Sequence, residues 1–208
     1  MIKAIIFDLD GVLVDATEWH YEALNKALKL FGFEINREMH VGEYNGLPTR
    51  KKLEMLSVQK GYPRELHEFT NKLKQNYTKD VILLGCKPYF EKQLMLSKLK
   101  AEGYTLVVCS NSIRESIELM LKKSGIIDYF DFFIGNDEGF ASKPAPDIYL
   151  HALKKLDISA NEAVIVEDAP HGIAAAKASG AHTCEVEGFH EVNYDRVKNY
   201  VKGVDLKW

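Results

Sequence analysis

The sequence has few cysteines, no long apolar run and no excess of basic residues. The three cysteines (Cys86, Cys109 and Cys184) are odd in number and match no zinc-binding spacing, so neither a disulfide framework nor a zinc site is expected. No apolar run reaches the roughly 20 residues that a transmembrane helix needs. With a net charge of −3, the chain lacks the basic footprint of a nucleic-acid binder. We therefore expect a cytoplasmic protein without a leader peptide, bound neither to a membrane nor to nucleic acid.

Hydrophobic residues make up 46% of the 208 residues, enough for one medium domain or for a core with a smaller addition. Several short apolar runs rich in Val, Ile and Phe are predicted strands: 4–9, 105–110, 132–135, 163–167 and 183–186. They show little alternation, which is typical of parallel strands covered on both faces. Helical patterns separate the later runs, at 112–124, 147–155 and 171–179. The pattern predicts an α/β fold with a doubly wound parallel sheet.

The segment between the first two strands breaks this alternation. Its last part, 89–102, is a predicted crossover helix, but residues 15–84 contain only helical patterns, at 17–31, 49–59 and 65–78. The economical interpretation is a core of residues 1–14 and 85–208, with a small helical cap domain inserted at 15–84. Such an insertion would lie over the end of the first strand.

Two acids, Asp8 and Asp10, end the first apolar run. Residues two apart in a strand share a face, so we expect the two carboxylates to converge at the end of the strand. Two converging carboxylates resist joint ionisation unless a cation is present. A hydrophobic core has no use for this arrangement, whereas a site that binds a metal and attacks phosphorus does.

Other polar residues follow the remaining strands at the edge where open parallel sheets bind ligands. They are Ser110 and Asn111 after the second strand, Lys143 before the helix that follows the third, and Glu167 with Asp168 at the end of the fourth.

These signals, in this order, resemble the haloacid dehalogenase-like superfamily of phosphotransferases. They are Asp8-Leu9-Asp10-Gly11-Val12, Ser110 after an apolar strand, Lys143 in Ser142-Lys143-Pro144, and Glu167-Asp168 followed by Gly172. The helical insert is similar to the first cap class of this family. Asp15, His20, Gly46 and Arg50 are similar to residues of the branch that contains beta-phosphoglucomutase and small-metabolite phosphatases.

The resemblance implies a role for each residue of the core. Asp8 would be the nucleophile that forms an aspartyl-phosphate, and Asp10 the general acid and base. Lys143 would neutralise charge and Ser110 would bind a phosphate oxygen. Mg2+ would be held by Asp8, by the backbone carbonyl of Asp10, by Asp168 and by Glu167, the last directly or through water.

The substrate-binding residues would be Asn111 in the core and His20, Gly46 and Arg50 in or near the cap. His20 and Arg50 have plainer explanations. A single His is more often structural, and an Arg on a helix is often only solvated. Asp15 can cap the first cap helix, Ser112 can cap a helix with Glu115 three residues on, and Trp19 fits the cap's apolar stripe.

The sequence departs from the family pattern in three places. Ala169 and Pro170 stand where Ser or Thr often follows the acids, Val12 replaces a common Thr, and Asn45 stands where the mutase carries a lysine. The last difference favours hydrolysis over the mutase reaction. The expected function is thus a Mg2+-dependent phosphatase for a small sugar, polyol or other alcohol phosphate, acting as a monomer or weak homodimer. A phosphomutase is the alternative, followed by an inactive binding protein and a dehalogenase.

Overall fold

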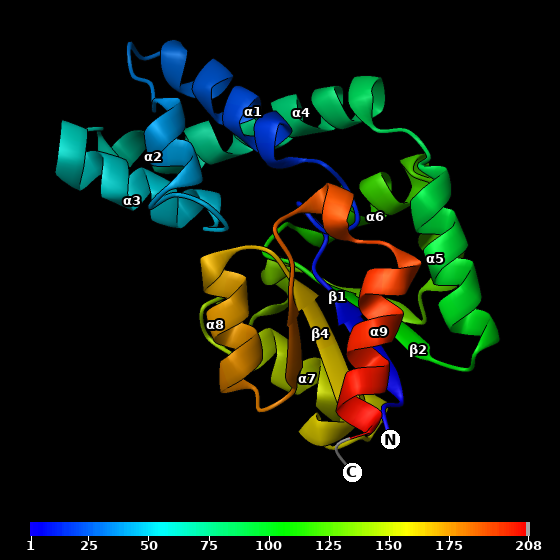
Figure 1. Ribbon diagram of the computed structural model, residues 1–208. Helices are drawn as coiled ribbons and strands as arrows, with labels where there is room; N and C mark the ends of the chain where they lie inside the picture. Colours follow the sequence, from blue (N-terminus) through cyan, green and yellow to red (C-terminus); the bar gives the residue numbers. More distant parts are fainter. Residues whose placement is uncertain (207–208) are drawn as a thin grey trace.

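The computed structural model describes residues 1–206 and has a parallel sheet at its centre. The strand order is β3-β2-β1-β4-β5. Figure 1 shows β1 between β2 and β4. The strands are β1 (Ala4–Phe7), β2 (Thr105–Cys109), β3 (Phe132–Ile134), β4 (Ala163–Glu167) and β5 (His182–Glu185). The chain winds outward from β1 through β2 to β3, then returns past β1 to β4 and β5. The predicted doubly wound sheet is therefore confirmed.

Helices cover both faces of the sheet, which explains why the strands are apolar throughout. One face packs against α5 (Phe90–Ala101), α6 (Arg114–Lys123) and α9 (Tyr194–Asp205). The other packs against α7 (Asp147–Leu156) and α8 (Pro170–Ala178). In β1, Ile5 and Phe7 enter the first layer and Ile6 enters the second. Both side-chain sets of the strand are thus removed from water.

The inserted cap consists of α1 (Thr17–Lys29), α2 (Arg37–Val41), α3 (Thr49–Lys60) and α4 (His67–Gly85). It has an apolar cluster of its own, formed by Leu24, Leu28, Ile35, Tyr44, Leu53, Leu56 and Tyr62. As predicted, the cap contains no strand within the described chain. We propose that the division falls at residues 15 and 84, as the sequence suggested. Short 3₁₀ turns complete the chain at Arg64–Leu66, Ile127–Tyr129, Asn136–Glu138, Ala160–Glu162 and Phe189–Glu191.

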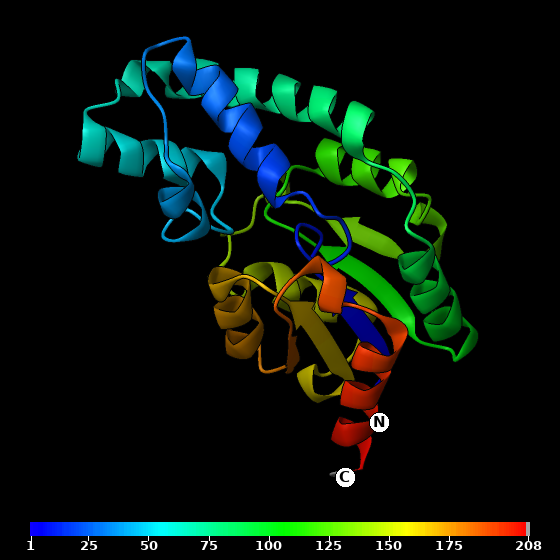
Figure 2. The ribbon, with the colours of Figure 1, turned by 45° about the horizontal axis from the view of Figure 1, so that its top comes forward.

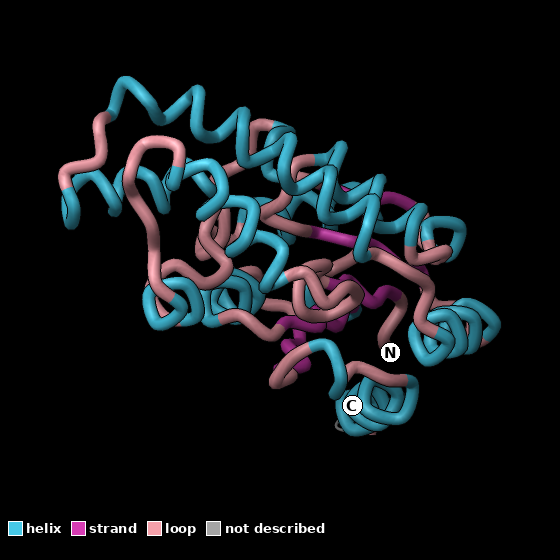
Figure 3. Tube along the Cα trace, turned by 90° about the horizontal axis from the view of Figure 1, so that it is seen from above, coloured by secondary structure: helices cyan, strands magenta, loops and turns pink. Residues whose placement is uncertain are grey.

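The cap lies over the carboxyl ends of the strands (Figure 2). Viewed from the cap side, its helices extend across the sheet (Figure 3). Because the winding direction reverses between β1 and β4, the ends of these two strands form the crevice where such sheets bind ligands. No helix within residues 1–206 is both long enough and apolar enough to cross a membrane.

Candidate active site

Asp8 follows β1 at the floor of the crevice, where Lys143 binds it. Lys143 Nζ lies 2.6 Å from Asp8 Oδ1, 2.6 Å from Glu167 Oε1 and 2.9 Å from the carbonyl oxygen of Cys109. These partners lie at the ends of the three central strands, so one ammonium ties β1, β2 and β4 together. Burial opposes its charge, but Asp8 and Glu167 together raise the pKa of Lys143, which therefore stays protonated. Lys143, expected at the surface but for the resemblance, is 4% exposed.

Asp10 faces the same crevice but not by strand alternation, because β1 ends at Phe7. A turn carries it there: the N–H groups of Leu13 and Val14 each donate to the carbonyl of Leu9 at 2.9 Å. The expectation that the strand itself aligns the two acids is wrong. The turn needs Gly11, whose φ is +86° and whose added Cβ would lie 2.2 Å from Asp168 Oδ2.

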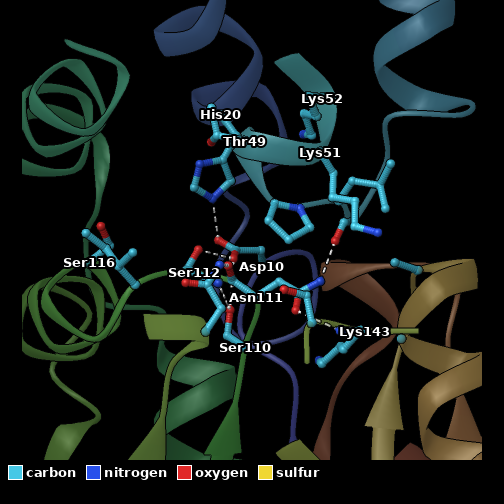
Figure 4. Close-up of a pocket in the computed structure, with 18 of the residues that line it drawn as sticks. Asp10, His20, Thr49, Lys51, Lys52, Ser110, Asn111, Ser112, Ser116 and Lys143 are labelled. Atoms are coloured by element: carbon cyan, nitrogen blue, oxygen red, sulfur yellow. Dashed lines mark hydrogen bonds and ion pairs between the residues drawn. The ribbon is translucent and has the colours of Figure 1, made fainter. Parts of the chain in front are cut away.

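Three side chains hold Asp10 as a carboxylate. His20 Nε2 donates to Asp10 Oδ1 at 2.8 Å, and the hydroxyls of Ser112 and Ser110 donate to Oδ2 at 2.8 Å and 3.3 Å (Figure 4). Burial alone would raise the pKa of Asp10, but His20 and Ser112 lower it to about 2. Lys74 Nζ donates to His20 Nδ1 at 3.1 Å. Burial and Lys74 lower the pKa of His20, so the imidazole is neutral with its proton on Nε2.

Asp8, Glu167 and Asp168 form the acidic cluster suited to a metal ion. One carboxylate oxygen from each lies within 4.8 Å of the others. Asp168 Oδ1 is buried without a hydrogen-bond partner, so it is free to accept a cation. Burial and Glu167 raise the pKa of Asp8 well above its ordinary range and that of Asp168 to about 7. A bound cation would offset the repulsion between these carboxylates, so the residues fit a divalent ion.

Glu167 has a different environment from Asp168. Its Oε1 accepts from Lys143 and from Tyr149 Oη at 2.7 Å, and its Oε2 accepts from the N–H of Asp168 at 3.1 Å. Gly172 makes room for this carboxylate, because a Cβ there would lie 1.9 Å from Glu167 Oε1. The protein thus occupies the Glu167 oxygens that a direct ligand would need.

All the residues predicted for the site line one cavity of about 610 Å3 between core and cap. The core contributes Asp8, Asp10, Ser110, Asn111, Lys143, Glu167 and Asp168, and the cap side contributes His20, Gly46 and Arg50. Asn111 joins the two parts, since its Nδ2 donates to the carbonyl of Gly46 at 2.8 Å while its Oδ1 accepts from the N–H of Lys143 at 3.1 Å.

Two predicted helix caps are wrong. Asp15 is exposed, and α1 begins after Ala16 without a side-chain cap. Ser112 is no cap either, because α6 begins after Ile113 and the Ser112 hydroxyl binds Asp10 instead. Trp19, as predicted, packs against the apolar core.

Sequence reasoning also missed Tyr149, Lys52 and Lys74. Tyr149 lies two residues beyond Asp147 of the Lys143 segment, on the buried face of α7, and this spacing was the available signal. Lys52 and Lys74 stand among other lysines of α3 and α4, and no local pattern separates them.

Comparison with known proteins identifies the family to which the chain belongs. Residues 5–186 match the haloacid dehalogenase-like hydrolase family. The phosphoglycolate phosphatase of Aquifex aeolicus is 34% identical over 182 residues, which cover 88% of this chain and 83% of that protein. The beta-phosphoglucomutase of Bacillus subtilis is 30% identical, over 86% of this chain and 80% of that protein.

The crystal structure of beta-phosphoglucomutase from Clostridium difficile has the same fold. It superposes with a TM-score of 0.84 over 99% of this chain and 100% of that chain, at 22% identity. The match of the family along most of the sequence, together with these relatives, confirms the resemblance seen in the motifs. The chain belongs to the haloacid dehalogenase-like hydrolase family.

Proposed function

We propose that this protein is a Mg2+-dependent phosphatase that hydrolyses a small phosphorylated metabolite through an aspartyl-phosphate on Asp8. The substrate would be the phosphate ester of a sugar, a polyol or another alcohol. The observation that carries the proposal is the pairing of Asp8, bound at 2.6 Å by Lys143, with Asp10 across one cavity beneath a cap. A nucleophile, a counter-charge and an acid–base group are the parts that this reaction needs.

The reaction divides into two displacements at phosphorus. An oxygen of Asp8 bonds to phosphorus while the ester P–O bond breaks, and Asp10 gives its proton to the departing alcohol oxygen. Asp10 then takes a proton from water, whose oxygen bonds to phosphorus as the Asp8–phosphorus bond breaks. The second displacement returns a free Asp8 and a protonated Asp10, so protons balance over the cycle.

The network around Asp10 supports its role as the base. A pKa of about 2 means that this carboxylate is ionised at neutral pH, which is the form that can accept a proton from water. For the first displacement it must carry a proton, and the approach of a negatively charged phosphate raises the pKa of a neighbouring acid. Ser110, whose hydroxyl reaches Asp10 at 3.3 Å, can then turn to a phosphate oxygen.

Asp8, Asp168 and the backbone carbonyl of Asp10 would hold Mg2+, with Glu167 reached through water. The unpartnered Oδ1 of Asp168 favours it as a direct ligand, and the occupied oxygens of Glu167 favour the indirect one. The bound ion supplies positive charge that offsets the repulsion between the acids and a phosphate. Lys143 supplies charge at Asp8 whether or not the ion is bound.

A phosphomutase is the second candidate, and the relative from Bacillus subtilis that carries this name favours it. A mutase returns the phosphoryl group to a sugar instead of passing it to water. Release of inorganic phosphate, without a bisphosphorylated sugar activator, distinguishes hydrolysis from transfer.

The test is phosphate release from a panel of sugar, polyol and carboxylic-acid phosphates, with Mg2+ or with a chelator. We expect release with Mg2+, none with the chelator, and a rate about 10²–10⁴-fold lower in Asp10→Asn. Asp195→Asn, which changes an exposed acid of α9, serves as the control. Equal release with and without the ion, or an Asp10→Asn variant as fast as the wild type, would contradict the proposal.

A further inference from the structure

The cap wall of the cavity carries positive charge without a matching acid. Lys52 on α3 and Lys74 on α4 both line the cavity, and each is more than nine-tenths buried. Arg50 and Lys51 belong to the same wall. Within residues 1–206, the cap contributes no aspartate or glutamate to this lining. A concave wall of one sign attracts a ligand of the other sign.

Lys74 has a partner, but Lys52 does not. Lys74 Nζ donates to His20 Nδ1, whereas Lys52 forms no hydrogen bond or ion pair with any group in the described part of the chain. Burial and the charge of Lys74 lower the pKa of Lys52 to about 7, although the Asp10 carboxylate of the core opposes this shift. An unpaired ammonium costs free energy in a buried place, and an arriving anion removes that cost.

His40, the neighbour of Lys52, does not serve as a second cation. His40 Nε2 donates to the carbonyl of Thr17 at 3.0 Å. Burial and Lys52 lower the pKa of His40 to about 4, so its ring is neutral at pH 7. Arg50 and Lys51 on the same wall are exposed, so within the described chain Lys52 is the buried cation of this wall that lacks a partner.

The reacting phosphoryl group belongs on the opposite wall. Asp8, Ser110 and Lys143 are core residues, whereas Lys52 lies with His20 on the cap side of the cavity (Figure 4). A volume of about 610 Å3 is that of a site for a whole small molecule, with room beyond one phosphate group.

We propose that Lys52 anchors a second anion subsite, so that the preferred substrate is a short phosphate ester with a second oxyanion at its far end. That oxyanion is a carboxylate or a second phosphate. The inference rests on the proposed phosphatase function and makes its substrate class narrower.

The test compares phosphate release from three short esters in the wild type, Lys52→Met and Lys52→Arg. 2-Phosphoglycolate carries a far carboxylate, 1,3-propanediol bisphosphate a far phosphate, and 2-hydroxyethyl phosphate only a hydroxyl. Lys60→Met, which changes an exposed lysine of the same helix, is the matched control. Thermal unfolding of every variant is measured in parallel.

We expect Lys52→Met to lower kcat/KM by about 10- to 100-fold for at least one ester that has a second anionic group. The effect should fall mainly on KM, because a charged hydrogen bond to the substrate is lost. The loss should be much smaller for 2-hydroxyethyl phosphate and partly restored in Lys52→Arg. Of the two esters with a second anionic group, the one whose kcat/KM falls more shows whether that group is a carboxylate or a phosphate. The melting temperature of Lys52→Met should equal or exceed that of the wild type, since the variant removes an unpaired buried charge.

Equal losses on all three esters would overturn the inference, because Lys52 would then serve the reacting phosphoryl group. Unchanged rates on all three, or a lower melting temperature with a uniform loss, would overturn it as well. The wild type could hydrolyse sugar phosphates that have no second anionic group, but neither of the two esters that have one. That result would also refute the subsite and leave the phosphatase function standing. Failure of the wild type on every ester with Mg2+ would remove both.

Discussion

At the scale of single residues, the site depends on how closely charges of opposite sign approach one another. Among residues 1–206, Lys143 is the one cation within hydrogen-bond distance of Asp8 and Glu167, and it contacts the ends of three neighbouring strands. The acids leave no space for a Cβ atom at Gly11 or Gly172. Substitution of such a glycine therefore tests the packing around the acids.

Gly172→Ala should lower both activity and stability. The new Cβ would lie 1.9 Å from Glu167 Oε1, and Glu167 cannot retreat because Lys143 and Tyr149 hold it. Overpacking costs about 1–3 kcal/mol, more than the roughly 1 kcal/mol that alanine adds in a helix interior. Gly203→Ala in α9 is the control, because nothing lies within 4 Å of that position and the helix should gain stability. Urea unfolding of the wild type and both variants measures these changes. A Gly172→Ala variant as stable as the wild type would refute the steric argument.

The sequence predicted the residues whose role depends on a strand end. Asp8 and Asp168 directly follow β1 and β4, and parallel strands bring their ends together, whereas Lys143, in the loop before α7, was predicted only from the family resemblance. The sequence could not predict Ser112, Lys52 or Lys74. Their positions depend on how the turn before α6 and the cap helices pack against the core, which is a tertiary effect without a local pattern.

At the scale of elements, the cap is a small helical unit with its own apolar cluster. Leu56 on α3 is 1% exposed within that cluster, while Val58 on the same helix is 79% exposed. Leu56→Ala should lower the free energy of unfolding by about 2–5 kcal/mol because it leaves a cavity. Val58→Ala should change it by about 0.5 kcal/mol or less. Chemical denaturation measures both, and similar values would contradict a packed cap core.

Every helix predicted from the sequence is present, but the predicted bounds differ and some helices were not predicted. The strand 163–167 was predicted with its observed bounds, but α4 extends to Gly85, beyond the predicted end at Thr78. Its buried stripe consists of Thr70, Lys74, Thr78 and Ile82, mostly polar residues, so hydrophobic periodicity could not show it. α2 and α9 were not predicted. α9 has its buried valines at Val197, Val201 and Val204, spaced for a helix, and this signal was overlooked.

At the scale of the whole molecule, metal binding should stabilise the fold. Burial and Glu167 raise the pKa of Asp168 to about 7, so near pH 8 the metal-free site holds several repelling carboxylates. A ligand at a hundred times its dissociation constant stabilises by about 2.7 kcal/mol. Mg2+ should therefore raise the melting temperature at pH 8, a chelator should reverse the rise, and Asp168→Asn should abolish it. An equal rise in Asp168→Asn would place the ion elsewhere.

The most direct test of the account is to look for the covalent intermediate itself. The protein is mixed with Mg2+ and a hydrolysed ester, quenched in acid within one turnover, and analysed by mass spectrometry. We predict a species heavier by one phosphoryl group, with the added mass on the peptide that contains Asp8. It should be absent in Asp8→Asn, which should fold normally and release no phosphate. Phosphate release by Asp8→Asn at the wild-type rate would contradict the central claim.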